Sequence, residues 1–468
     1  MKVIIIGCTH AGTVAATEIM KTHPETDLTI YERTDNFSFL SCGISLYLEG
    51  EVKQLEDMFY SSPQELRDMG ATVHDRHDVL KVDAKAHTIQ VANMETGEVF
   101  EDTYDKLIMT TGSSVKVPPL YGIDNTRVLL CKNYQQAQAI YKASKEYHNI
   151  AIIGAGYSGV EFAEALSGTG HHVSVFQARS QVLNNYVDDS MSNWAVKLLK
   201  EHHVDVHLDT QVSAFTGDDN TDQITIETNQ GDFKTDMAIV STGFTPNTSL
   251  LSGQVKIERH GSFLTNRFLQ TSDPDIYAAG DCCMVRFNPT GSSAYTPLAS
   301  VAIRQGTLVA HNIFAHTHPY VGTQASSALK IYGNALATTG LTLTHALKRG
   351  IDADSVTFDG TWRPDYMPST DRLVIVLVYE KTTRRVLGAQ LLSKHDITQS
   401  ANAVSIAIQN NNTIDDLAFV DMLFQPNFDY PFNYLNQVAQ LAVDKEATAG
   451  RTMPRFTAPG YEKEDQEN

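Results

Sequence analysis

The stretch that decides the fold is Asn149-Ile150-Ala151-Ile152-Ile153-Gly154-Ala155-Gly156-Tyr157-Ser158-Gly159. A run of β-branched residues ends in three glycines with the spacing GxGxxG, and a helical segment, 160–168, and a strand, 172–177, follow. A strand, a tight glycine turn and a helix N-terminus form a site for a dinucleotide pyrophosphate, because backbone N–H groups and the helix dipole face the anion. The stretch therefore predicts a Rossmann-type domain.

A less regular copy of this pattern opens the chain at Lys2-Val3-Ile4-Ile5-Ile6-Gly7-Cys8-Thr9-His10-Ala11-Gly12, with Thr9 in place of the usual second glycine. The next strand, 28–32, ends in Glu32, where a carboxylate can accept hydrogen bonds from an adenosine ribose. Two such patterns in one chain are far more specific than one. We expect an α/β protein with two Rossmann-type dinucleotide-binding domains.

Composition narrows the class of protein further. The 468 residues are 42% hydrophobic and 19% charged, which is typical of a soluble protein with two or three domains. The net charge of −19 disfavours a nucleic-acid or anionic-membrane partner. The sequence has no run of 18 apolar residues and shows no signal-peptide cleavage site, so we expect a cytoplasmic protein. The five cysteines show no CxxC pair and no metal-ligand spacing, so we expect neither a disulfide framework nor a bound metal.

Across essentially its whole length the sequence resembles the flavoprotein disulfide reductases that bind two dinucleotides. The segments Ser41-Cys42-Gly43, Thr9-His10-Ala11-Gly12-Thr13 and Phe424-Gln425-Pro426-Asn427-Phe428 are similar to the single-cysteine branch of that superfamily. This branch contains NADH oxidases, NADH peroxidases and coenzyme A-disulfide reductases. The similarity is greatest to the water-forming NADH oxidases, since coenzyme A-disulfide reductases usually have Asn before the cysteine.

The resemblance implies three domains and a homodimer. An FAD-binding domain would comprise residues 1–113 and 244–322, and an NAD(P)-binding domain residues 114–243. Residues 323–450 would form a C-terminal α+β dimerisation domain, followed by a flexible tail, 451–468. Strand patterns at 328–332, 355–358, 373–379 and 386–392, followed by helical patterns at 399–410 and 431–443, agree with the α+β class.

The resemblance also implies cofactor contacts, with Phe424 reaching the flavin from the other subunit of the dimer. The residues expected to contact FAD are Gly7, His10, Ala11, Gly12, Glu32, Cys42, Val79, Thr111, Ser113, Lys132, Tyr157, Asp281, Leu298, Ala299, Ser300 and Phe424. Those expected to contact NADH or NADPH are Gly154, Gly156, Ser158, Gly159, Gln177, Arg179, Ser180, Tyr186 and Gly243.

The chemistry that the resemblance implies is the reduction of O2 to two H2O by two NAD(P)H, through reduced flavin and peroxide. A reactive thiol of low pKa beside the flavin would attack the peroxide O–O bond and become a sulfenic acid. Cys42 is the candidate for that thiol, because a helix expected near Gly43 would favour the thiolate. His10 is the candidate proton donor, since histidine titrates near neutral pH. The alternative for His10 is a role in positioning FAD alone.

One departure from the related NADH enzymes concerns the nicotinamide cofactor. Those enzymes usually have Asp or Glu at the end of the second strand, where this chain has Gln177-Ala178-Arg179-Ser180. A neutral amide, a cation and a hydroxyl suit a 2′-phosphate. We therefore expect NADPH to be accepted alongside NADH. Alternatively, Gln177 bonds the ribose and Arg179 faces solvent.

Other functions use the same motifs. An NADH peroxidase or a coenzyme A-disulfide reductase would also use FAD and Cys42. A non-enzymatic redox sensor would bind both nucleotides without turnover, and the complete Cys42 loop argues against it.

Overall fold

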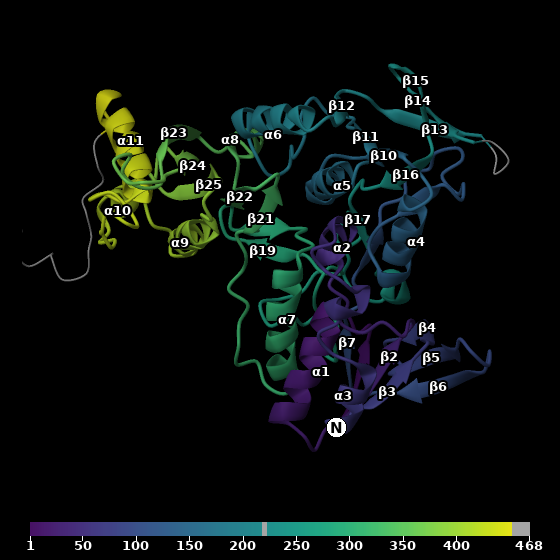
Figure 1. Ribbon diagram of the computed structural model, residues 1–468. Helices are drawn as coiled ribbons and strands as arrows, with labels where there is room; N and C mark the ends of the chain where they lie inside the picture. The colour runs from purple at the N-terminus through teal and green to yellow at the C-terminus, as the bar shows by residue number, and fades with distance from the viewer. Residues whose placement is uncertain (218–221, 452–468) are drawn as a thin grey trace, which may run out of the picture. The chain divides into compact units, whose positions relative to one another are not determined.

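The N-terminal β-branched run folds as the central strand of a parallel sheet in the computed structural model, which describes residues 1–217 and 222–451 (Figure 1). Helix α1 (His10–Thr22) follows the glycine turn. In spatial order the five strands of the sheet are β18 (Ile276–Ala278), β7 (Lys106–Met109), β1 (Lys2–Ile6), β2 (Asp27–Glu32) and β3 (Thr72–Asp75). The edge strand β18 thus comes from a part of the chain far from the other four.

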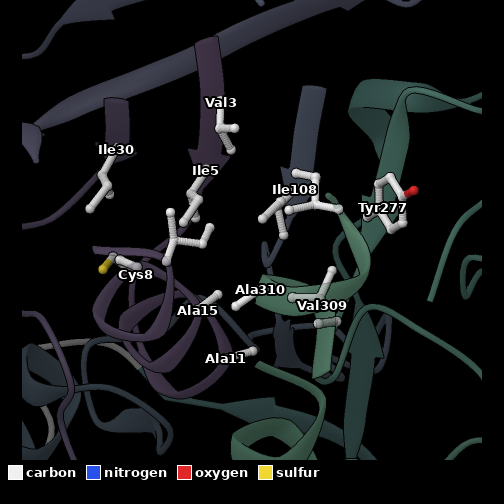
Figure 2. Close-up of a cluster of buried hydrophobic side chains, with 14 of the residues drawn as sticks. Val3, Ile5, Cys8, Ala11, Ala15, Ile30, Ile108, Tyr277, Val309 and Ala310 are labelled. Carbon is white, nitrogen blue, oxygen red and sulfur yellow. The ribbon is translucent and has the colours of Figure 1, made fainter. Parts of the chain in front are cut away.

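The core of this sheet lies on the face that α1 and α7 (Ala299–Asn312) cover. Figure 2 shows Val3, Ile5, Ile30 and Ile108 extending from the strands towards the small side chains of these two helices. Those helix residues include Ala11, Ala15, Val309 and Ala310. Burial of the β-branched side chains stabilises the layer, and the small residues let the helices approach closely.

The stretch around Gly154 forms a second parallel sheet of the same design. In spatial order its strands are β12 (Asp205–His207), β11 (His172–Phe176), β10 (Asn149–Ile153), β16 (Met237–Val240) and β9 (Val128–Leu130). Helix α5 (Tyr157–Gly168) connects β10 to β11, and α4 (Tyr134–Ser144) precedes β10. The α6 helix (Asp189–Glu201) comes before β12.

Smaller antiparallel sheets accompany the two parallel ones. One consists of β4 (His77–Asp83), β5 (Thr88–Asn93) and β6 (Val99–Thr103), and another of β13 (Val212–Thr216), β14 (Ile224–Thr228) and β15 (Gly231–Thr235). Strand β8 (Ser113–Val115) leads into the second parallel sheet and pairs antiparallel with β17 (Phe244–Pro246), which leads out of it. The two connections therefore run side by side.

The described chain divides into two compact units, and both parallel sheets belong to the first. Unit 1 comprises residues 1–185, 192–287 and 291–323, and unit 2 comprises 186–191, 288–290 and the described residues from 324 on. The expected tail, 451–468, lies outside the described residues after Arg451.

Unit 2 is built on one antiparallel sheet. In spatial order its strands are β21 (Ser327–Ile331), β22 (Asn334–Gly340), β25 (Val386–Ser393), β24 (Arg372–Glu380) and β23 (Ala353–Thr361). Its helices are α8 (Leu343–Lys348), α9 (Thr398–Gln409), α10 (Ile414–Phe419) and α11 (Tyr434–Thr448). Buried side chains of α9, α10 and α11 share one core with β24 and β25, so the α+β class predicted for this part is confirmed.

Several boundaries differ from the sequence predictions. Helix α5 begins at Tyr157 rather than at 160, and α11 begins at Tyr434 rather than at 431. Strand β22 and helix α10 were not predicted from the sequence. None of the helices in residues 1–217 and 222–451 combines the length and the apolar character that a bilayer crossing requires.

Candidate functional site

The first glycine turn is a tight backbone crossing between β1 and α1. Gly7 has a φ of +93°, and a Cβ on Gly12 would lie 2.0 Å from the carbonyl oxygen of Gly7. No side chain larger than hydrogen fits at Gly12. The N–H of Cys8 donates to the Glu32 carboxylate at 2.7 Å, and Glu32 also accepts from the N–H of Thr34 at 2.9 Å. Glu32 therefore fixes the turn in addition to the ribose contact expected of it.

This turn fits the pyrophosphate of FAD. Helix α1 starts with no side-chain cap and has no acidic residue in its first turn. An uncapped helix N-terminus beside a glycine crossing favours an anion, because N–H groups and the helix dipole both point to it. His10 and Ala11 open the helix at this point.

The second glycine turn repeats the crossing. Gly154 has a φ of +104°, and a Cβ on Gly159 would lie 2.0 Å from the Gly154 carbonyl oxygen. Gly156 is the N-cap of α5 and provides no side-chain cap. A Cβ on Gly156 would meet no atom within 4 Å, so that position is open on the side where a pyrophosphate approaches.

The loop after β11 holds the residues expected to select the nicotinamide cofactor. The Gln177 side chain is buried, and its Nε2 donates to the Gln181 carbonyl at 2.8 Å and to Asn184 Oδ1 at 3.1 Å. Arg179 and Ser180 are exposed. Gln177 thus organises its own loop, while Arg179 and Ser180 are accessible to a ligand.

Cys42 lies in a 3-10 turn, Ser41–Gly43, directly before the short helix α2 (Ile44–Glu49), which packs against α5. Its side chain is exposed, yet the surrounding protein atoms desolvate the thiol and raise its pKa. The charge of Glu161 raises the pKa further, and that of Lys132 lowers it. The low pKa that the sequence analysis expects for Cys42 is therefore not found, because desolvation is the largest effect on this thiol and raises its pKa.

Lys132 and Asp281 form an ion pair at 3.2 Å beside this loop. Asp281 also accepts from the Ser113 hydroxyl at 2.7 Å, and the Lys132 ammonium lies 4.0 Å from the centre of the Phe244 ring. The charges of both pair members act on the pKa values of Cys42 and His10. The structure thus brings together Cys42, His10, Lys132 and Asp281, which are far apart in sequence.

His10 contacts a residue that sequence reasoning missed. Its Nδ1 lies 3.0 Å from the Tyr60 hydroxyl, and the two rings are parallel within 4°. Burial lowers the pKa of His10, so the neutral imidazole predominates at neutral pH. No local motif marks Tyr60, which follows the short 3-10 helix Leu55–Met58.

Glu161 is the second missed residue. It lies in α5, two positions after Gly159, and burial raises the pKa of its carboxyl to about 7. Its charge acts on both Cys42 and Cys131. The available sequence signal was only an acid between Val160 and Phe162 in the helix that follows the glycine turn.

The other expected contacts occupy varied positions. Val79 is buried in β4, the Thr111 hydroxyl donates to the Asn247 carbonyl at 2.5 Å, and Gly243 has a φ of +96° just before β17. Leu298, Ala299 and Ser300 form the start of α7, and Tyr157 and Ser158 the start of α5. Tyr186 and Phe424 belong to unit 2.

The remaining cysteines are less accessible. Cys8, Cys282 and Cys283 are buried, and Cys131 is half-buried, with a thiol pKa that burial raises. Within residues 1–217 and 222–451, no group of three or more His, Cys, Asp or Glu side chains is arranged to hold a metal ion.

Comparisons with known proteins show the family of the chain. Residues 1–306 match the family model described as pyridine nucleotide-disulphide oxidoreductase, and 327–432 match its dimerisation domain. The chain is 44% identical to the NADH oxidase of Enterococcus faecalis over 444 residues, covering 95% of this chain and 100% of that protein.

Two solved structures are similar over 96% of the chain. The water-forming NADH oxidase of Lactobacillus brevis bound to NADH has a TM-score of 0.95 and 47% identity, covering 96% of this chain and 100% of the other. An engineered water-forming NADPH oxidase, a mutant of that enzyme bound to NADPH, has a TM-score of 0.95 and 46% identity with the same coverage.

Proposed function

Because the chain belongs to the pyridine nucleotide-disulphide oxidoreductase family, we propose that it is an FAD-dependent oxidase that reduces O2 to water with NADH or NADPH. The observation that carries the proposal is the position of Cys42. It is an exposed thiol beside the Lys132–Asp281 pair, in the same unit as two glycine turns suited to dinucleotides. The similarity to NADH oxidases over 95% of the chain supports it.

FAD is the cofactor of this family. The residues that would hold it are the Gly7–Gly12 turn, Glu32, Lys132 and Asp281. When bound, FAD takes a hydride from the reduced nicotinamide and passes on two electrons.

The role of Cys42 is to remove peroxide before it escapes. The thiolate sulfur attacks one oxygen of H2O2, an S–O bond forms and the O–O bond breaks, so the sulfur is oxidised by two electrons to a sulfenic acid. The leaving hydroxide takes a proton and becomes water. Two electrons and two protons, the electrons from a second NAD(P)H, return the sulfenic acid to the thiol and release a second water.

Desolvation and the neighbouring charges together set the fraction of Cys42 that is thiolate. Desolvation by the surrounding protein and the charge of Glu161 raise the pKa of the thiol, whereas Lys132 lowers it. A protonated Glu161 would remove the opposing charge, and its pKa of about 7 allows this near neutral pH. His10, neutral at this pH, would supply the proton to the leaving hydroxide.

Acceptance of NADPH rests on the loop after β11. Gln177 has no charge to repel a 2′-phosphate, and the exposed Arg179 and Ser180 are suited to bind one. The engineered relative that binds NADPH lost an aspartate and gained two arginines and a serine among its substitutions. This chain likewise has no acid at position 177 and has an arginine at 179 and a serine at 180.

We further propose a homodimer in the cytoplasm. The C-terminal domain matches a dimerisation domain, and it exposes the apolar residues Phe419, Val420, Leu423, Phe424, Phe428 and Phe432. Free thiols at all five cysteines suit a reducing compartment.

The test is the amount of NAD(P)H consumed per O2 in an oxygen electrode, with peroxide assayed in the same cell. The proposal expects two NAD(P)H per O2 and no accumulated peroxide. One per O2 with stoichiometric peroxide would show that Cys42 does not complete the cycle. No oxygen uptake would overturn the oxidase, and H2O2 and coenzyme A disulfide would then be tested as substrates of a peroxidase or a disulfide reductase.

A further inference from the structure

We propose that Tyr60 is a positioning residue for the peroxide step: its hydroxyl donates to Nδ1 of His10 and thereby places the imidazole proton on Nε2. The inference rests on the proposed function, because it concerns the proton that the leaving hydroxide takes when Cys42 is oxidised. Tyr60 itself contacts neither the reacting sulfur nor the peroxide in this scheme.

The first argument is the direct contact. The Tyr60 hydroxyl lies 3.0 Å from Nδ1 of His10, which is an ordinary hydrogen-bond distance. Burial raises the pKa of Tyr60, so the phenol keeps its proton and remains a donor. A neutral imidazole has one donor and one acceptor nitrogen. When Nδ1 accepts from the phenol, Nε2 carries the proton.

The second argument is how rigidly Tyr60 is held. Ser38 is fully buried, and its Oγ accepts the N–H groups of Tyr60 at 3.1 Å and Ser61 at 2.8 Å. The same hydroxyl donates to the Ser61 carbonyl at 2.8 Å. Ser38 has a φ of +62°, a left-handed conformation that a serine adopts at a cost. The backbone around Tyr60 is therefore fixed by one specific side chain.

The third argument is that the same segment leads to Cys42. The N–H of Leu40 donates to the Met58 carbonyl at 3.0 Å, and Phe39 forms an antiparallel bridge with Phe59. The N–H of Ser38 donates to the Cys8 carbonyl at 3.3 Å, next to the turn that holds His10. Residues 38–40 thus connect the His10 turn, the Tyr60 segment and the Cys42 loop.

In the step that follows, the Cys42 sulfur forms its bond to one peroxide oxygen while the O–O bond breaks. The other oxygen leaves as hydroxide and takes the Nε2 proton of His10, giving water, and a proton from solvent then restores the neutral imidazole. Without the Tyr60 hydroxyl, the imidazole populates both tautomers and loses the contact that orients its ring. A proton on Nδ1 is on the wrong side of the ring to reach the same acceptor.

The experiment measures how fast H2O2 oxidises Cys42 in enzyme that has a reduced Cys42 thiol and bound, oxidised FAD, without NAD(P)H and under anaerobic conditions. Alkylation of the remaining thiol and mass spectrometry of the Cys42 peptide give the rate constant. The variants are Tyr60→Phe, His10→Gln and the two combined. Tyr134→Phe is the matched control, because its hydroxyl bonds Glu56 and its ring packs on Phe39 without contacting His10.

We expect Tyr60→Phe to lower the rate constant about tenfold, a part of the 10²–10⁴-fold that general acid catalysis supplies. In the His10→Gln background the same change should have no effect, since Tyr60 acts only through the imidazole. An unchanged rate in Tyr60→Phe, or an equal loss in both backgrounds, would overturn the inference. The FAD absorbance spectrum of each variant reports that the fold is intact.

The inference and the proposed function fail in different ways. An enzyme that takes up no O2 but whose Cys42 reacts with H2O2 in a Tyr60-dependent manner contradicts the oxidase and supports the role of Tyr60. An enzyme that consumes two NAD(P)H per O2, and in which Tyr60→Phe does not change the rate of Cys42 oxidation, supports the oxidase and contradicts the role of Tyr60.

Discussion

The Lys132 ammonium lies 3.2 Å from the Asp281 carboxylate, although the two residues follow strands of different parallel sheets. The pair joins the loop after β9 to the loop after β18 and places one positive and one negative charge beside Cys42. The reactivity of the thiol therefore depends on how two separately built sheets meet within unit 1.

This dependence predicts opposite effects of two substitutions on the pKa of Cys42. Lys132→Met removes the charge that favours the thiolate, so the pKa rises and alkylation of Cys42 requires a higher pH. Glu161→Gln removes the charge that opposes it, so the pKa falls. We expect shifts of about one unit in each direction. The measurement is the iodoacetamide reaction rate at Cys42 against pH, and shifts of the same sign would contradict it.

Replacing the thiol itself separates oxygen reduction from peroxide removal. Cys42→Ser should change the stoichiometry from two NAD(P)H per O2 to one, with H2O2 accumulating, because serine cannot form a sulfenic acid. Cys131→Ser is the control, since this half-buried thiol should leave the ratio at two. A Cys42→Ser enzyme that still makes only water would disprove the peroxide step.

The cofactor loop predicts a selective loss of NADPH. In Gln177→Asp the new carboxylate repels the 2′-phosphate, so kcat/KM for NADPH should fall at least about tenfold while that for NADH is kept. Arg179→Ala should lower kcat/KM for NADPH about tenfold, because the charge-assisted hydrogen bond to the 2′-phosphate is lost. NADH in the same preparations is the internal control. A wild-type enzyme that does not use NADPH would refute the proposal.

Two glycines predict contrasting outcomes for the same substitution. Gly12→Ala places a methyl 2.0 Å from the Gly7 carbonyl oxygen, so we expect a loss of at least about 3 kcal/mol in the free energy of unfolding. Gly156→Ala meets no atom within 4 Å and should cost less than about 1 kcal/mol. It should nonetheless raise the Kd for NAD(P)H about tenfold, because the methyl occupies the side that the pyrophosphate approaches. Urea unfolding measures the free energy of unfolding of both variants, and titration with NAD(P)H measures the Kd.

The exposed apolar residues of unit 2 predict the oligomeric state. Leu423 and Phe428 are 71% and 65% exposed, which is unusual for large apolar side chains. Leu423→Asp combined with Phe428→Asp should reduce the mass in light scattering from twice 51.6 kDa to 51.6 kDa. Tyr121→Asp, at a 76% exposed aromatic of unit 1, is the control and should leave the dimer intact. A wild-type monomer would refute the dimer.

Local sequence signals were sufficient for the central strands of the parallel sheets, but not for β3, β9 and β12. The β-branched runs before Gly7 and Gly154 became β1 and β10, because a buried parallel strand needs apolar residues on both faces. Strand β22 was missed because Asn334–Gly340 is rich in alanine and threonine, and pairing with β21 and β25 decides its conformation. Helix α10 is six residues long, too short for a periodic pattern, although a capping box of Thr413 and Asp416 marks its start.

The sequence provides candidate site residues only where a motif marks them. His10, Cys42 and Asp281 lie in or next to recognisable motifs at the ends of strands and the start of a helix. Tyr60 and Glu161 reach the site through tertiary packing. The segment after Met58 packs against residues 38–40 and places Tyr60, and α2 packs against α5, which contains Glu161. The spacing of residues along the sequence does not predict such contacts.

The sheet order has a consequence for biosynthesis. Every strand of the second parallel sheet lies between residues 128 and 240, whereas the first sheet needs β18, which begins at Ile276. On the ribosome all strands of the second parallel sheet are therefore synthesised before the first parallel sheet receives β18. Until then β7 presents an unpaired edge to other nascent chains. The protein is most exposed to misassembly during that interval of its own translation.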